Sequence, residues 1–124
     1  MKDPSNPVCR TISTLLSRIG DKWTVLVVTT LAAGGKRFNE LRREIPSVSQ
    51  RMLTLTLRNL ERDGLVTRTV TPSIPPRVDY ALTKLGASLL VPLEGLASWA
   101  LDNVGAIHAA RAQYDAQMDE REAA

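Results

Sequence analysis

The basic side chains best suited to binding a ligand lie together on one segment in the middle of the chain. If this segment is a helix, Leu57 and Leu60 fall within about 40° of Leu53 on one face. The opposite half then carries five residues, three of them arginines: Arg51, Thr54, Leu55, Arg58 and Arg62. A guanidinium group can bond bidentately to guanine or pair with a phosphate. We interpret this face as a reader of nucleic acid; the alternative is an ordinary solvated helix face.

The net positive charge is concentrated in the same region. Residues 36–84 hold ten basic and five acidic side chains, whereas the residues before them have a net charge of +2 and those after them −4. A basic region is the electrostatic footprint of a surface that binds a polyanion, and the acidic end would be repelled by such a partner. The distribution favours DNA as the partner of the middle segment; the alternative is chance variation in surface charge.

The elements that must position these residues are predicted mainly to be helices. A chain of 124 residues suits one compact domain and is too short for a barrel enzyme or a second substrate domain. Apolar spacing predicts a helix over residues 11–19. Asp21 is expected to cap the next helix, which stops at Gly34 and Gly35. Its inward face is expected to hold Trp23, Leu26, Val27 and Leu31.

A short helix should precede the long one that carries the arginines. Asn39 is expected to cap the short helix, which ends before Pro46. Ser47 followed by Gln50 has the form of a capping box and predicts the start of the long helix. Gly64 should close that helix. Two consecutive helices of this kind indicate a helix-turn-helix.

Two strand-like segments follow the long helix. Residues 66–71 are β-branched and alternating, and residues 78–82 alternate as well. The intervening residues 72–76 are too rich in proline for a tight turn, so we expect a stiff projecting loop. Arg77 follows this loop and would suit a narrow minor groove; the alternative is a surface pair with Asp79. The hairpin is the wing of a winged helix-turn-helix.

The C-terminal part is predicted to be helical, and its apolar stripes over residues 85–100 and 107–118 are more than a 124-residue monomer can readily cover, so we expect a dimer. Thr83 should cap a helix that reaches Ala100, with a kink at Pro92, and residues 107–118 should form a final helix after Gly105. The fold class is therefore α+β and mainly α, with a two-stranded wing and terminal helices for dimerisation. We expect one domain over residues 1–124, with N-terminal helices (8–33), a helix-turn-helix (36–64), a wing (65–82) and dimerisation helices (83–121).

Five ordered blocks between about residues 9 and 100 resemble the HxlR-type transcriptional regulators. They are IGDKWT (19–24), RFNELRR (37–43), SQRMLT (49–54), LRNLERDGLV (57–66) and PPRVDYALT (75–83). The resemblance implies a bacterial or archaeal homodimeric winged-helix regulator whose terminal helices make the dimer contacts. It also implies that several relatives respond to oxidants or quinone-like electrophiles through a cysteine near the first helix.

These observations predict the residues that contact DNA. They are Lys36, Arg37, Ser47, Ser49, Gln50, Arg51, Thr54, Leu55, Arg58 and Arg77. Leu55 departs from the family pattern, in which a polar residue is frequent at this position; a leucine can pack on a thymine methyl but cannot donate to a base edge.

The remaining candidate sites are few. Cys9, beside Arg10, is a candidate redox sensor, and an inert thiol is the alternative. Trp23 and Trp99 are candidates for a ligand pocket, although core or interface packing is the simpler interpretation. With one cysteine and one histidine, His108, we expect no metal site. No phosphate loop, nucleophile elbow or catalytic triad is indicated, so we expect no cofactor and no enzymatic activity.

The predicted function is sequence-specific DNA binding by a homodimer that acts as a repressor or an activator on an inverted-repeat operator. An electrophile acting through Cys9, or a ligand bound without a covalent bond at the dimer interface, is a possible effector. The alternative function is a winged-helix dimerisation or interaction module without DNA readout. No apolar run approaches a membrane span and no signal core is evident, so we expect a cytoplasmic protein without membrane contact.

Overall fold

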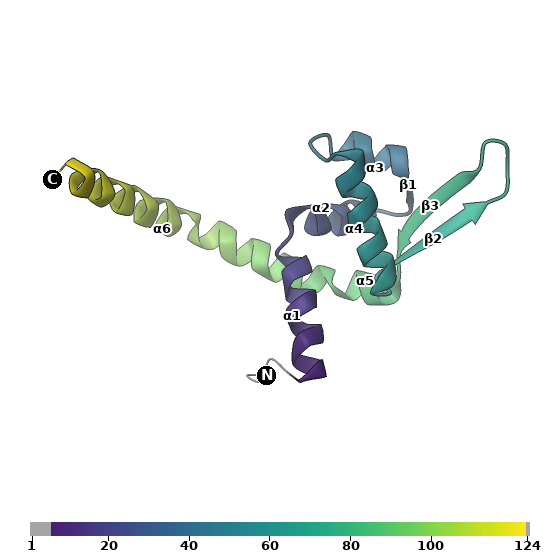
Figure 1. Cartoon of the computed structure of the whole chain (residues 1–124), viewed down its shortest axis with the longest axis horizontal. Coiled ribbons are helices and arrows are strands. Elements are labelled where there is room, and N and C mark those ends of the chain that lie inside the picture. Colours follow the sequence, from purple (N-terminus) through teal and green to yellow (C-terminus); the bar gives the residue numbers. More distant parts are fainter. Residues whose placement is uncertain (1–5, 124) are drawn as a thin grey trace. The chain divides into compact units, whose positions relative to one another are not determined.

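The structure is a computed structural model that describes residues 6–123, which form two compact units, one ending at Leu90 and the other beginning at Val91. Its elements, labelled in Figure 1, are α1 (Pro7–Ile19), α2 (Lys22–Leu31), β1 (Lys36–Arg37), α3 (Phe38–Glu44), α4 (Gln50–Arg62), β2 (Val66–Thr71), β3 (Arg77–Leu82), α5 (Lys84–Ser88) and α6 (Leu90–Ala123). The mainly helical winged fold class is confirmed. The single domain over residues 1–124 stays a prediction, and residues 1–5 and 124 lie outside the described residues.

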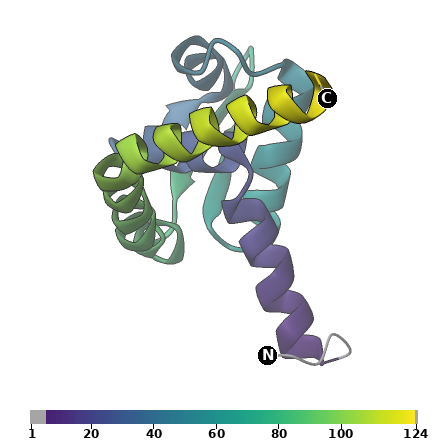
Figure 2. The same ribbon diagram turned by 90° about the vertical axis from the view of Figure 1, so that its left-hand side faces the viewer.

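The first two helices begin at side-chain caps. Asn6 accepts the backbone N–H of Val8 at 2.9 Å, and Pro7 occupies the first helical position, so α1 begins before the predicted residue 11. Asp21 caps α2 as predicted, accepting from the Trp23 N–H at 2.8 Å. The N-terminal turns of α1 extend away from the other helices of this unit (Figures 1 and 2).

The helix-turn-helix begins at different caps from those predicted. α3 starts at Phe38, so its N-cap is Arg37 rather than Asn39, and Glu40 accepts the Arg37 backbone N–H at 3.1 Å. Ser49, not Ser47, caps α4, because its hydroxyl accepts from the Met52 N–H at 3.0 Å. The predicted capping box of Ser47 and Gln50 is therefore wrong. A turn closed by the Val48 N–H and the Ile45 carbonyl, 3.1 Å apart, keeps Ser47 outside the helix.

The wing contains one more strand than predicted. β1 pairs antiparallel with β3, and β3 pairs antiparallel with β2, which gives the sheet order β1–β3–β2. The register places Arg37 opposite Asp79, and the last pair of the hairpin is Thr71 with Arg77. A strand of two residues has no periodicity to detect, so only its pairing with β3 defines it.

The core of the first unit joins α2, α3, α4 and β2. The leucine face of α4 is buried as its spacing predicts, and so are Leu41 of the short helix and Ile45 at its C-cap. The buried apolar residues of these elements are Val27, Val28, Leu31, Leu41, Ile45, Leu53, Leu57, Leu60 and Val66. Leu26, expected on the inward face of α2, is exposed instead, while Val28 is buried. This core leaves the arginine face of α4 outside.

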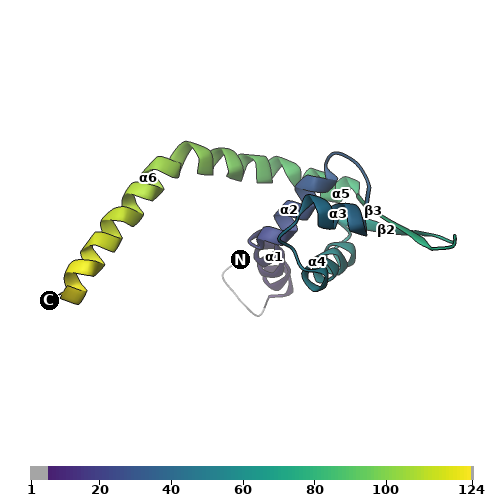
Figure 3. The same ribbon diagram turned by 90° about the horizontal axis from the view of Figure 1, so that it is seen from above.

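The C-terminal helices divide near Pro92. Thr83 caps α5 as predicted, but α5 ends at Ser88 and α6 begins at Leu90. Pro92 cannot donate to the Ser88 carbonyl, and its ring would clash there, so the helix is interrupted rather than kinked. α6 continues through Gly105 to Ala123, with a bend near its middle (Figure 3). Within residues 6–123 no helix is long and apolar enough to cross a membrane.

Candidate nucleic-acid interface

The outward face of α4 is a shallow basic surface. A cavity of about 530 Å³ is lined by Gln50, Arg51, Thr54, Leu55 and Arg58. Leu55 is 49% exposed, and neither arginine forms an ion pair with any residue of the described range. The Thr54 hydroxyl donates to the Gln50 carbonyl at 2.8 Å, so it can only accept from a ligand. The surface thus offers two unpaired guanidinium groups beside one apolar side chain.

Arg62 lies apart from this surface. It lines a second cavity, of about 350 Å³, with residues of α1 that include Arg10 and Arg18. Arg18 pairs with Asp63 and donates to the Asn59 carbonyl at 3.4 Å, so α1 is tied to the C-terminal end of α4. The helical wheel places Arg62 on the outward half, but its position along the axis brings it to α1 instead.

The sheet extends the basic surface beside α4. A cavity of about 370 Å³ is lined by Thr54, Arg58, Glu61, Arg68 and Tyr80. Arg68 on β2 stands opposite Tyr80 on β3 in the register. Our sequence reasoning did not single out Arg68, and its only signal was a basic residue within an alternating strand. Arg58 therefore borders both the outward face of α4 and the sheet.

A larger groove separates the start of α3 from the wing. Its volume is about 780 Å³, and its lining residues are Arg37, Phe38, Asn39, Glu40, Arg43, Pro75, Pro76, Arg77 and Val78. Pairing of β1 with β3 brings these segments together, because Arg37 stands opposite Asp79. Three arginines and one glutamate give the lining a positive balance. We call this the α3–wing groove; Arg43 is a member that the sequence analysis did not propose.

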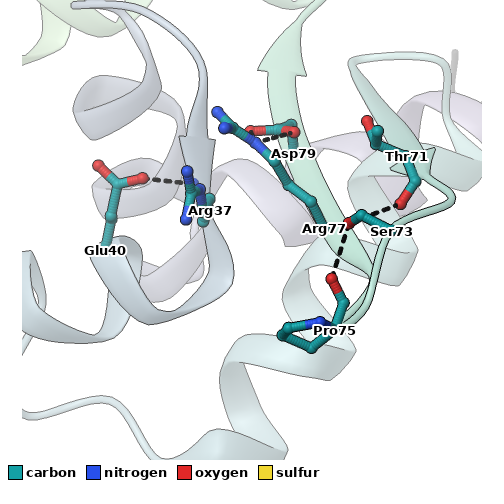
Figure 4. A network of polar contacts seen from close by, with 7 residues as sticks. All are labelled: Arg37, Glu40, Thr71, Ser73, Pro75, Arg77 and Asp79. Atoms are coloured by element: carbon teal, nitrogen blue, oxygen red, sulfur yellow. Dashed lines mark hydrogen bonds and ion pairs between the residues drawn. The ribbon is translucent and has the colours of Figure 1, made fainter.

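Arg77 is paired within the wing (Figure 4). Its Nε lies 3.3 and 3.0 Å from the two carboxylate oxygens of Asp79. Hydrogen bonding to Asp79 raises the pKa of Arg77 above its usual value, and the charges of Asp79 and then Glu40 act in the same direction. The surface pair that we held as the alternative role of Arg77 is therefore present, and half of the side chain remains exposed.

Two other predicted contact residues, Lys36 and Ser49, already have partners within the protein, and a third, Ser47, lies outside α4. Lys36 pairs with Glu44 at 3.1 Å, which offsets its charge. Ser49 uses its hydroxyl oxygen to cap α4, although its hydroxyl hydrogen can still be donated. Ser47 is exposed in the turn before α4.

The candidate effector residues belong to three helices, α1, α2 and α6. Cys9 is half-buried in the first turn of α1. Trp23 is half-buried on α2 with the Lys22 ammonium 4.5 Å from its ring centroid, and Trp99 on α6 is 59% exposed. No group of three or more His, Cys, Asp or Glu residues within positions 6–123 is placed to hold a metal ion.

Comparisons with known proteins agree on one kind of protein. The sequence model described as HxlR-like helix-turn-helix matches residues 18–108. An uncharacterized HTH-type transcriptional regulator of Methanothermobacter thermautotrophicus is 48% identical over 88 residues, which cover 71% of this chain and 67% of the relative. YdeP of Bacillus subtilis, described in the same words, is 41% identical over 107 residues, or 84% of each chain.

Solved structures are similar in fold as well as in sequence. The redox regulator HypR in its reduced form has a TM-score of 0.72 and 40% identity, covering 80% of this chain and 98% of its own. The reduced form of the regulator YodB from Bacillus subtilis has a TM-score of 0.67 and 35% identity, covering 77% of this chain and 90% of its own.

Proposed function

This chain belongs to the HxlR-like helix-turn-helix family and is a transcriptional regulator of helix-turn-helix type, and from that premise we propose that it binds an inverted-repeat DNA operator as a homodimer. The observation that carries this proposal is the outward face of α4, where Arg51 and Arg58 are exposed without an acidic partner in the described chain. A module that only dimerises has no use for such a face.

In this proposal α4 enters the major groove, which is about 12 Å wide and admits a helix. Arg51 and Arg58 contact guanine edges or phosphates, and Leu55 packs on a thymine methyl. The α3–wing groove receives the adjacent sugar–phosphate strand, with Arg37 and Arg43 as phosphate contacts. Phosphate contacts fix the position of the protein on the duplex, and the face of α4 then supplies the sequence information.

Exposed apolar faces on α1 and α6 support the proposal that two copies of the chain form a dimer. α1 buries none of its residues, and Leu16 on it is 57% exposed. The exposed large apolar residues of α6 are Val91, Leu96, Trp99, Leu101, Val104 and Tyr114. Monomeric proteins rarely leave so many apolar side chains in water, so we assign these faces to a twofold interface. In the proposed dimer the two copies of α4 lie about 34–36 Å apart or a multiple of that, as half-sites separated by whole helical turns require.

The dimer is testable by light scattering at micromolar concentration. We expect twice the mass of one chain for the wild type. Leu16→Glu should shift the protein toward monomer, because it places a charge in a desolvated interface. Val70→Glu, on an exposed position of the wing, is the matched control and should leave the mass unchanged. A monomeric wild type contradicts the proposed dimer.

We also propose that Cys9 makes the regulator responsive to electrophiles. HypR has been solved in reduced and oxidised forms, and YodB in reduced and diamide-treated forms. Cys9 lies on α1, within the proposed interface, and Arg18 ties the same helix to the end of α4. A single cysteine per chain limits the chemistry to alkylation, a mixed disulfide or a disulfide between the two copies of Cys9.

The energy needed for this response is modest. A difference of about 2.7 kcal/mol between two dimer arrangements changes operator affinity about 100-fold. Diamide should therefore release wild-type protein from DNA and leave Cys9→Ser bound, as measured by fluorescence anisotropy. Equal release of both proteins, or of neither, removes Cys9 from the mechanism. A ligand bound without a covalent bond near Trp23 or Trp99 then becomes the better proposal for the effector.

Two further expectations follow from a regulatory role. The relatives are named as transcriptional regulators, so we infer that the chain has no enzymatic activity and needs no cofactor. Because its proposed target is genomic DNA, we place its action in the cytoplasm. If the wild type binds none of the DNA sequences tested, the alternative function, a winged-helix interaction module without DNA readout, is favoured instead.

A further inference from the structure

The tip of the wing is apolar. Residues 72–76 connect Thr71 to Arg77 and carry no charge, and three of these five residues are prolines. Figures 1 and 3 show the β2–β3 hairpin projecting beyond α2, α3 and α4, with this loop at its far end. Ile74 lies within the loop and is fully exposed, at 104% of its reference area. A single exposed isoleucine is ordinary. Whether Ile74 indicates a binding site therefore depends on how the loop holds it and on which residues lie beside it.

The loop holds Ile74 in a defined position. The Ser73 hydroxyl lies 2.7 Å from the Pro75 carbonyl oxygen and 3.5 Å from the Thr71 carbonyl oxygen, which closes the loop on itself (Figure 4). Pro72 and Pro75 flank the pair of Ser73 and Ile74, and each proline ring fixes its own backbone φ. Little conformational entropy then remains to be lost when the tip meets a partner.

The neighbours of Ile74 identify that partner. Pro75 and Pro76 line the α3–wing groove together with Arg37 and Arg43. A sugar–phosphate strand in this groove would border a groove of the duplex, and the tip would stand at its edge. Arg77, the nearest cation along the chain, is paired with Asp79 and is the first residue of β3 rather than part of the tip. The chemistry at the tip is therefore apolar, while the charges beside it suit phosphate.

We propose that Ile74 is a wedge that enters the minor groove from the tip of the wing and bends the operator. Apolar side chains delivered to the minor groove partly unstack a base step and bend the duplex away from the protein, toward the major groove. The cost of unstacking is lowest at flexible pyrimidine–purine steps such as TA and CA. The proposal rests on the proposed function and adds a specificity that needs no hydrogen bond to a base.

The test compares Ile74→Ser with Ile74→Leu on one probe. The probe is a duplex that the wild type selects from a random-sequence library, with a fluorescent dye at each end. Ile74→Ser should bind about tenfold more weakly, since full burial of an isoleucine is worth about 10- to 150-fold in affinity and unstacking offsets part of it. Energy transfer between the two dyes should also fall, because a straighter duplex holds its ends farther apart. Ile74→Leu should keep both properties.

The salt dependence separates the wedge from a phosphate contact. Ile74→Ser removes no charge, so the slope of log affinity against log salt should be unchanged. Arg77→Ala should reduce that slope by about two if Arg77 meets a phosphate, because each dimer carries two copies of the residue. The Ile74 side chain is fully exposed, so the Ile74 variants should melt at the same temperature as the wild type, which would exclude misfolding.

Two results would overturn the inference in different ways. If Ile74→Ser retains wild-type affinity and energy transfer while Arg51→Ala binds weakly, the wedge is wrong and the proposed function stands. If Arg51→Ala also binds as the wild type does, the docking of α4 in the major groove is wrong, and the wedge that depends on it is wrong too.

Discussion

Alanine in place of Arg51 or Arg58 is expected to weaken operator binding by about 1–3 kcal/mol each, or about 5- to 150-fold. Both guanidinium groups lie on the outward face of α4, and neither has an acidic partner in the described chain that would compete with DNA. If an arginine contacts guanine, its loss should relax specificity at one base pair. If it contacts phosphate, the loss should be uniform across sequences, and the salt slope should shrink by about two, because each dimer carries two copies of the residue.

Arg62→Ala is the matched control for this prediction. Arg62 has the same side chain, is exposed, and lies on the same helix, but it lines the cavity beside α1. Its replacement should leave base specificity intact and change affinity far less than Arg51→Ala does. Anisotropy titrations at two salt concentrations measure all three variants. An equal loss for Arg62→Ala would show that net charge, rather than the face of α4, governs binding.

The largest expected effect on stability is that of Gly86→Ala. Gly86 is buried in α5, and a Cβ there would overlap the Leu65 carbonyl oxygen, a backbone atom that cannot move aside as a side chain can. The Leu65 carbonyl also accepts the Thr83 N–H at 3.0 Å, so a shift of either segment breaks the junction between α4, the sheet and α5. We expect the free energy of unfolding to fall by about 3 kcal/mol, the upper part of the range for overpacking.

Gly20→Ala provides the control for this experiment. Gly20 adopts right-handed helical angles, and a Cβ there would meet only ordinary contacts at 3.5 Å. Alanine at this position should be neutral or slightly stabilising, because it restricts the unfolded chain. Urea unfolding at one fixed protein concentration compares the two variants, since a dimer unfolds in a concentration-dependent way. Equal stability of Gly86→Ala and the wild type would contradict the close packing of α5 on Leu65.

Local sequence signals predicted much of this fold. Asp21 and Thr83 cap helices as their side chains suggest, and Gly64, with a φ of +75°, closes α4 where only glycine adopts the angle readily. The leucine spacing predicted the buried face of α4, and the alternation of side chains predicted both long strands of the wing. Each of these signals acts within a few residues of the chain, so its physical cause is present in the sequence itself.

The candidate interface was predictable in its composition and less so in its arrangement. The outward position of Arg51 and Arg58 follows from helical geometry, since both lie opposite the buried leucines. Helical geometry does not predict that Arg62 lies apart from these two arginines, because its surroundings depend on where α1 contacts α4. Lys36 and Glu44 are eight residues apart, and only the packing of β1 beside α3 makes them an ion pair.

The sequence by itself determined the order of the longer helices and strands, the caps at Asp21 and Thr83 and the basic face of α4, because these depend on interactions between near neighbours. The tertiary structure alone decided the third strand, the α3–wing groove and the contact of Gly86 with Leu65. Pairing of Arg37 with Asp79 joins segments more than forty residues apart, and no local pattern encodes such a contact. The groove beside the apolar tip therefore arises from packing between elements, whereas the tip residue Ile74 is visible in the sequence only as one isoleucine among prolines.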